Sequence, residues 1–130
     1  MAINIRVIAP DRTVFDTEVQ EVILPSSTGQ LGILRGHAPL LTALDIGVMR
    51  VRTDKDWTPI VLMGGFAEVE NDELTILVNG AEEGASINKE EAQKELEEAT
   101  IRFNEAESSK DRIEATQNLR KARARAQASA

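Results

Sequence analysis

The chain divides sharply near Ile87, because all eight glycines and all four prolines precede that residue and none follows it. Glycine and proline occur in turns and at strand bends, but each disrupts the interior of a helix. We therefore expect a β domain over residues 1–86 and a helical domain over residues 87–130. A chain of 130 residues is long enough for one ordinary domain, or for one small domain with an appendage.

The first part carries the alternating pattern of half-buried strands. Ile3, Ile5 and Val7 are separated by Asn4 and Arg6, which is the two-residue period of a strand with one buried face. Many short strands at even spacing predict a β-sandwich or flattened barrel of about eight to ten strands. Further apolar runs between turn residues predict strands at 19–24, 31–34, 40–44, 48–53, 57–63, 66–70 and 74–78.

The second part carries two helix signals. Asn88 stands three residues before a glutamate, the spacing of a capping box, and predicts a helix over 88–107. Ser108 stands in the same way before an aspartate and predicts a second helix over about 110–128. The short connection makes an antiparallel hairpin. The predicted fold class is therefore α+β, with a β-sandwich followed by a two-helix hairpin.

The predicted seam between the helices is rich in alanine. Alanine removes little apolar area from water, at about 25 cal/mol per Å², so Leu96, Phe103 and Leu119 are expected to supply most of the adhesion. The hairpin is then the least stable part of the molecule and able to leave the sandwich or to open. Spacings of three and four assign to the seam Ala92, Leu96, Ala99, Phe103 and Ala106 on the first helix and Ala115, Leu119, Ala122 and Ala126 on the second.

Charge is divided between the two helices. Residues 88–109 carry three basic and seven acidic side chains, a net charge of −4, whereas residues 110–130 carry six basic and two acidic ones, a net charge of +4. The helices therefore complement each other in a hairpin, although exposed ion pairs contribute only about 0 to 1 kcal/mol each. A positive cluster near the end of the chain either binds an acidic partner or forms a solvated face. Its members are Arg120, Lys121, Arg123 and Arg125.

Composition excludes several classes of protein. The absence of cysteine excludes a disulfide framework and a cysteine-ligated metal site. A formal charge of −7 argues against nonspecific binding of nucleic acid. A single histidine, His37, is too few for most metal sites, and no P-loop motif is present. A hydrolase that uses Ser26 or Ser27 with His37 stays a minor alternative, and we interpret the chain as non-catalytic.

One family carries these features together. Leu31 to Leu40 (LGILRGHAPL), the Gly64-Gly65-Phe66 corner and Glu68-Val69 match, in order and spacing, the epsilon subunit of the F-type ATP synthase. The chain resembles that family over essentially its whole length. The length and the short helical tail are most similar to the cyanobacterial and chloroplast forms. Arg35 stands where the family usually has proline, which leaves the loop less rigid and adds a positive charge.

The resemblance implies a central-stalk subunit that joins the gamma subunit to the membrane rotor ring. Such a subunit couples proton flow to ATP synthesis and restrains ATP hydrolysis through its C-terminal helices. In the resting complex these helices are either folded down on the sandwich or extended away from it. The implied location is peripheral, on the stromal or cytoplasmic side of a thylakoid or cytoplasmic membrane, reached only through the complex. The alternative is a freestanding β-sandwich adaptor that binds a partner helix bundle, and co-purification with a large ATPase would separate the two.

The resemblance also implies site residues. The positive cluster would meet an acidic segment of the catalytic beta subunit. Some bacterial members bind ATP through an acid and a base that Asn88 and Glu91 replace here, so no cofactor is expected and ATP binding is expected to be weak or absent. The related nucleotide positions are Glu82, Ala92, Lys121 and Arg125. The implied contacts with gamma and the rotor ring are Gln30, Leu31, Arg35, His37 and Pro39.

Overall fold

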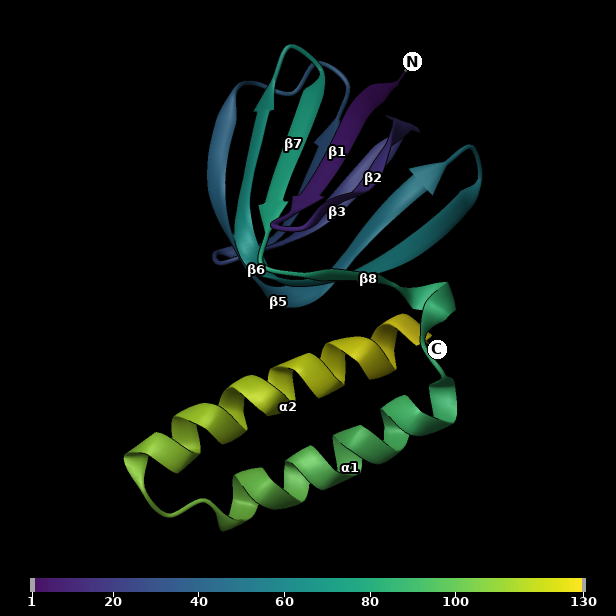
Figure 1. Cartoon of the computed structure of the whole chain (residues 1–130). Helices are drawn as coiled ribbons and strands as arrows, with labels where there is room; N and C mark the ends of the chain where they lie inside the picture. Colours follow the sequence, from purple (N-terminus) through teal and green to yellow (C-terminus); the bar gives the residue numbers. More distant parts are fainter. Residues whose placement is uncertain (1, 130) are drawn as a thin grey trace.

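The computed structural model describes residues 2–129, and it places a β-sandwich beside a helical hairpin (Figure 1). Over these residues the chain forms eight strands, then one short 3₁₀ helix and two α-helices. The predicted order of a β-sandwich followed by a hairpin is confirmed. The strands are β1 (Ile3–Ala9), β2 (Arg12–Val19), β3 (Glu21–Ser26), β4 (Gly29–Leu34), β5 (Leu40–Thr53), β6 (Asp56–Glu70), β7 (Glu73–Val78) and β8 (Ala81–Glu83). The helices are η1 (Gly84–Ser86), α1 (Lys89–Glu105) and α2 (Ser109–Ser129).

A single hydrogen-bonded sheet folds over on itself to make the two layers of the sandwich (Figure 1). The strand order is β2-β1-β7-β6-β5-β3-β4, and β8 pairs with β6. The β1–β7 pair is parallel, and the other pairs are antiparallel. The predicted alternation in β1 is confirmed, because Ile3, Ile5 and Val7 are fully buried in the space between the layers.

Two strands are longer than predicted. The runs 40–44 and 48–53 form the single strand β5, and the runs 57–63 and 66–70 form β6. Gly64 and Gly65 lie inside β6 with φ angles of 83° and 152°, so they bend the strand without ending it. A Cβ atom on Gly65 would lie 2.0 Å from the carbonyl oxygen of Leu77. Only glycine fits at this bend.

Strand β2 is absent from the predicted set. It lies at the edge of the sheet, where β1 is its hydrogen-bonded neighbour. Its last residue, Val19, is buried, Val14 and Phe15 are partly buried against the core, and the other five side chains are polar and exposed. An edge strand of this kind shows no two-residue alternation of apolar residues. Val19 was therefore assigned wrongly to the next strand, which begins at Glu21.

Both predicted helix caps are confirmed. The Oδ1 atom of Asn88 accepts a hydrogen bond of 3.0 Å from the backbone N–H of Glu91, and α1 begins at the next residue, Lys89. The Oγ atom of Ser108 accepts a bond of the same length from the N–H of Asp111. Each cap satisfies one of the backbone donors that a helix N-terminus leaves without an internal partner.

The seam between the helices differs in part from the predicted one. Leu96 and Ala99 pack against Leu119 and Ala122 as expected. Phe103 is 39% exposed, so its assignment as a main seam residue was wrong. A straight helix drifts by about 20° per heptad relative to a strict seven-residue repeat, and Phe103 lies one heptad beyond Leu96, near the end of α1.

The hairpin docks on the sandwich mainly through α2 (Figure 1). A small apolar cluster forms the junction, and α1 contributes to it only through Ala92, near its first turn. Neither described helix is long and apolar enough to cross a bilayer. The buried residues of this docking cluster are Val48, Val61, Ile87, Ala92, Ala124 and Ala128.

Candidate interaction sites on the sandwich and the hairpin

The predicted contact loop is tied to the turn between β6 and β7. The backbone N–H of Gly36 donates a 2.6 Å hydrogen bond to Oδ1 of Asp72, and Nε of Arg35 lies 3.7 Å from Oδ2 of the same carboxylate. The Nδ1 atom of His37 lies 2.6 Å from the carbonyl oxygen of Ala38. The unusual arginine therefore supplies an ion pair that a proline at position 35 cannot form.

The five predicted contact residues do not form one patch. Gln30 and Leu31 lie near the start of β4, whereas Arg35, His37 and Pro39 follow its end. At about 3.3 Å per residue, Gln30 and Arg35 are about 16 Å apart along the strand direction. Leu31 and His37 are half-buried, and the other three are exposed. The structure thus brings together only the three residues of the loop.

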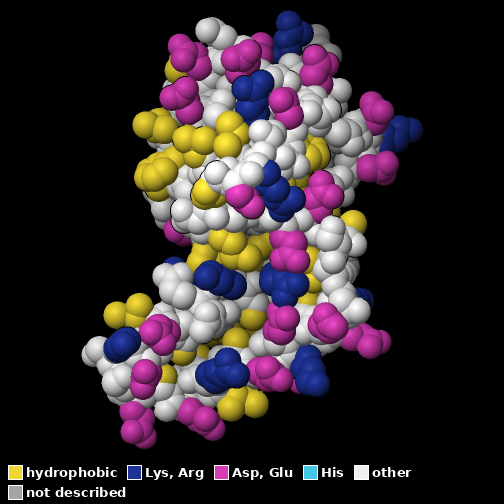
Figure 2. All heavy atoms as spheres, in the orientation of Figure 1, with side chains coloured by type: hydrophobic (Ala, Val, Ile, Leu, Met, Phe, Trp, Pro, Cys, Tyr) yellow, Lys and Arg dark blue, Asp and Glu magenta, His cyan; other side chains and the backbone are white. Residues whose placement is uncertain are grey.

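A row of apolar side chains crosses the outer face of the sandwich, and sequence reasoning missed it. Ile8 pairs with Leu77, Leu77 with Phe66, and Phe66 with Ala43, so the four residues lie side by side on neighbouring strands. Phe66 is 58% exposed and Leu77 is 53% exposed. Figure 2 shows hydrophobic side chains gathered on one side of the sandwich. The available signal was an apolar residue at positions where the strand period requires an outward side chain. We call Ile8, Leu77, Phe66 and Ala43 the apolar row.

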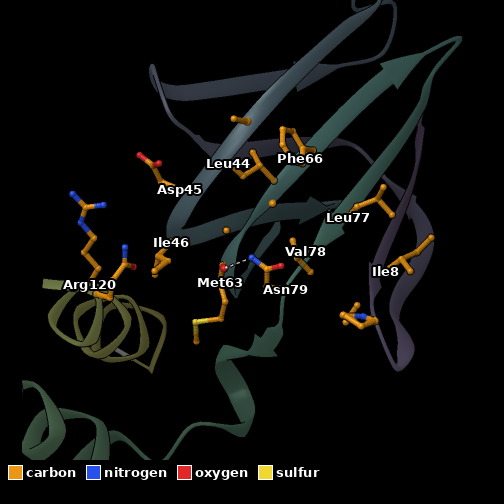
Figure 3. Close-up of a pocket in the computed structure, with 16 residues that line it drawn as sticks. Ile8, Leu44, Asp45, Ile46, Met63, Phe66, Leu77, Val78, Asn79 and Arg120 are labelled. Atoms are coloured by element: carbon orange, nitrogen blue, oxygen red, sulfur yellow. Dashed lines mark hydrogen bonds between the residues drawn. The ribbon is translucent and has the colours of Figure 1, made fainter. Parts of the chain in front are cut away.

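An open groove of about 660 Å³ lies between the apolar row and α2 (Figure 3). Phe66 and Leu77 line one side of it, and Arg120 of α2 lines the other. At its base the side-chain amide of Asn79 donates a 3.4 Å hydrogen bond to the backbone oxygen of Met63. The groove is therefore bounded by apolar side chains of the sandwich and a cationic side chain of the hairpin.

The positive cluster is divided between two sides of α2. Arg120 and Arg123 line a recess of about 270 Å³ beside residues 45–47 of β5. Lys121 and Arg125 instead line a recess between the helices, together with Glu95 of α1. Four positions that are close in the sequence therefore present two separate positive surfaces. In Figure 2, basic and acidic side chains lie next to one another at the junction of sandwich and hairpin.

Arg125 joins three elements of the structure. Its Nε and Nη2 atoms donate hydrogen bonds of 2.9 Å and 3.1 Å to the two carboxylate oxygens of Glu82, on β8. Its Nη1 atom donates to Glu95, on α1. Hydrogen bonds to Glu82, which has the larger effect, and to Glu95 raise the pKa of the Arg125 guanidinium above its usual value. The two carboxylates therefore stabilise the charged form of the guanidinium.

The four nucleotide candidates gather at the same place, but they are arranged for other contacts. Glu82 and Arg125 bind each other, and Ala92 is fully buried in the docking cluster. Lys121 is exposed beside Glu95. Between residues 2 and 129, no three His, Asp or Glu side chains are grouped to hold a metal ion. The carboxylates of Glu82 and Glu95 already pair with the guanidinium of Arg125, so this group is not available to a phosphate.

Ser26, one of the two serines considered for hydrolysis, is placed for a structural role. Ser26 is buried, and its hydroxyl lies 3.1 Å from the hydroxyls of both Thr28 and Thr42. The ring nitrogen of His37 is instead in contact with a backbone oxygen. Ser26 therefore belongs to a hydroxyl network in β3 and β5, and the described contacts do not pair it with an imidazole base.

Known proteins match both parts of the chain. The family model "ATP synthase, Delta/Epsilon chain, beta-sandwich domain" matches residues 2–84, and "ATP synthase, Delta/Epsilon chain, long alpha-helix domain" matches residues 86–130. The chloroplastic ATP synthase epsilon chain of Guillardia theta is 76% identical over 128 residues, covering 98% of each chain. The ATP synthase epsilon chain of Acaryochloris marina is 61% identical over 132 residues, covering 99% of this chain and 96% of the relative.

A solved structure shares the fold. A chain of the mitochondrial ATP synthase of Euglena gracilis, determined by cryo-electron microscopy with OSCP, F1 and the c-ring, superposes with a TM-score of 0.83. The match covers 94% of this chain and 78% of that one, at 23% sequence identity. The sandwich and the hairpin therefore occur together in a solved structure of low sequence identity.

Proposed function

Because the chain belongs to the delta/epsilon family of ATP synthase subunits, we propose that it is the epsilon subunit in the central stalk of a proton-translocating F-type ATP synthase. In this role it is non-catalytic, joins gamma to the membrane rotor ring and helps to couple proton flow to ATP synthesis. Its hairpin restrains ATP hydrolysis. Its place is peripheral, on a thylakoid or cytoplasmic membrane. Family matches over both domains support this role above a freestanding adaptor.

The apolar row is the observation that carries the proposed contact with gamma. Large exposed apolar patches on soluble proteins mark surfaces that a partner covers, and a rotor subunit needs a partner that stays bound while the stalk turns. Leu41 is also exposed and lies two residues before Ala43 on β5, so it extends the row toward the loop at Arg35 and His37. We assign the row to gamma and the loop to the border between gamma and the rotor ring.

The gamma contact is tested by the double variant Phe66→Gln and Leu77→Gln. Both side chains are outward, so the sandwich should fold normally, as checked by circular dichroism. Burying one such side chain contributes about 1.5 to 3 kcal/mol, so the affinity for isolated gamma should fall at least about tenfold. Ile113→Gln is the matched control, since Ile113 is equally exposed but lies on α2. Unchanged gamma binding by the double variant would overturn the assignment.

The positive side chains of α2 are the proposed contact for restraining hydrolysis. Arg125 is held by this chain's own carboxylates, so Arg120, Lys121 and Arg123 are the ones available to the beta subunit while the hairpin is docked. Close charge pairs chiefly set orientation and encounter rate, and each contributes modestly. Several must therefore act together.

Changing Arg120, Lys121 and Arg123 to glutamine should raise the ATP hydrolysis rate of the reconstituted complex and leave gamma affinity unchanged. The matched control changes Lys89, Lys94 and Lys110, which are exposed elsewhere on the hairpin. Restraint by the original protein should weaken with salt, because the Debye length falls to about 3 Å at 1 M. If both triple variants restrain hydrolysis as the original does, the bulk of the hairpin is the better explanation.

A further inference from the structure

The contacts within the hairpin are separate from the contacts that dock it. The seam cluster contains Ala99, Leu119 and Ala122, with Leu96 packed against it. The docking cluster contains Ala124 and Ala128 of α2 but only Ala92 of α1. No residue belongs to both clusters. Beyond its first turn, α1 is therefore held by α2 and not by the sandwich.

Arg125 lies where these two sets of contacts meet. It follows Ala124, a docking residue, and its guanidinium binds Glu82 on the sandwich through two parallel hydrogen bonds. The third nitrogen binds Glu95 on the other helix. Bidentate arginine–carboxylate pairs are the stronger and more directional kind of ion pair. Arg125 and Glu82 are half-buried, which reduces screening by water relative to a fully exposed pair.

We propose that Arg125 is a latch with two separable arms, of which the Glu82 arm docks the hairpin on the sandwich and the Glu95 arm holds the two helices together. When the Glu82 arm breaks, the guanidinium keeps its second carboxylate, and the seam keeps all of its apolar contacts. The hairpin then leaves the sandwich as one closed unit instead of opening into two helices. As a form of regulation, this inference rests on the proposed restraint of hydrolysis by the hairpin.

Two single-cysteine variants report separately on the docking contacts and the seam contacts, because the chain has no cysteine of its own. A thiol introduced by Ala124→Cys is buried by the sandwich, and one introduced by Ala122→Cys is buried by α1. When reclosing is faster than labelling, the rate of thiol modification follows the population of the open state. The isolated full-length protein is used, so the result does not depend on ATP synthase activity.

Glu82→Gln should speed the labelling of the thiol at position 124 about fivefold, which is the size expected from the loss of one partly screened ion pair. The labelling rate of the thiol at position 122 should not change. Glu95→Gln should speed labelling at position 122. Glu83→Gln is the matched control, since Glu83 is the exposed neighbour on the same strand and should change neither rate. Arg125→Lys keeps the charge but cannot form the two-point contact, and it should speed labelling at both positions.

The two-arm latch is overturned if Glu82→Gln speeds labelling equally at both positions, because the hairpin would then open as it undocks. It is also overturned if Glu82→Gln acts no differently from Glu83→Gln. ATP hydrolysis by the reconstituted complex is measured separately. A latch that behaves as expected without any change in hydrolysis would refute the proposed restraint and leave the latch standing.

Discussion

Gly84, the first residue of η1, lies against the end of α2, and Gly84→Ala tests that contact. A Cβ atom there would lie 2.5 Å from the carbonyl oxygen of Ala128 and 2.8 Å from Cγ of Pro59. It would also lie 3.0 Å from the carbonyl oxygen of Pro59. Two of these three atoms belong to the backbone, so no rotation of a side chain relieves the overlap. The added methyl group must therefore displace α2 or β6.

The size of the effect follows from these distances. Ordinary contacts of a Cβ atom begin at 3.4 Å, so Ala128 must withdraw by about 0.9 Å. Because a helix moves as a rigid body, the same shift lifts Ala124 away from Val48 and Val61 in the docking cluster. Overpacking of this kind costs about 1 to 3 kcal/mol. Undocking relieves only the overlap with Ala128, because the two contacts with Pro59 lie within the first 86 residues and remain.

Urea unfolding followed by circular dichroism measures the loss, with two comparisons. A fragment of residues 1–86 is expected to fold alone, so the same Gly84→Ala change made in that fragment measures the part of the loss that the Pro59 contacts cause. Gly32→Ala is the matched control, because no atom lies within 4 Å of its added Cβ and the change should stay within about 0.5 kcal/mol.

Two results would refute the reasoning about Gly84. If Gly84→Ala unfolds at the same urea concentration as the original protein, α2 does not approach the sandwich as closely as the structure places it. If Gly84→Ala destabilises the 1–86 fragment as much as it destabilises the full chain, the contacts with Pro59 account for the whole loss and the docking argument fails.

Two further predictions concern the bend in β6 and the nucleotide positions. Gly65→Ala should destabilise the sandwich by at least about 3 kcal/mol, because its Cβ would lie 2.0 Å from the oxygen of Leu77 at a φ of 152°; a melting temperature equal to that of Gly32→Ala would contradict this. The isolated protein should bind ATP weakly or not at all at millimolar concentration, and Asn88→Asp with Glu91→Arg should strengthen binding by replacing a repulsive carboxylate with a phosphate-pairing guanidinium. If calorimetry finds tight ATP binding by the original protein, the replacement of the motif's acid and base by Asn88 and Glu91 does not weaken ATP binding.

The order of the two architectures and the family were predictable from the sequence, because glycine and proline positions and the Leu31 to Leu40 motif are local signals. The resemblance to cyanobacterial and chloroplast epsilon subunits is confirmed by relatives at 76% and 61% identity. The caps at Asn88 and Ser108 were predictable for the same reason, since each acts within three residues along the chain.

The remaining features depend on contacts between distant parts of the chain. β2 is an edge strand, and its apolar residues Val14, Phe15 and Val19 follow no two-residue period. Alanine stands at every second position from Ala122 to Ala128, and this pattern does not show that Ala124 and Ala128 face the sandwich while Ala122 faces α1. The family resemblance named Glu82 and Arg125 as possible nucleotide-binding positions. Only the folded chain shows that these two residues, 43 positions apart in the sequence, bind each other.

The position of the docking residues near the end of α2 affects how a new chain matures on the ribosome. Domains generally fold as units, beginning with the N-terminal one during synthesis, so the sandwich can form while α2 is still being made. Arg125 and Ala128 follow the whole sandwich in the chain, and the hairpin cannot dock before they emerge. Every newly made molecule therefore passes through a stage in which its sandwich is folded and its hairpin is free, and a partner that captures the hairpin during synthesis would meet no competition from the sandwich.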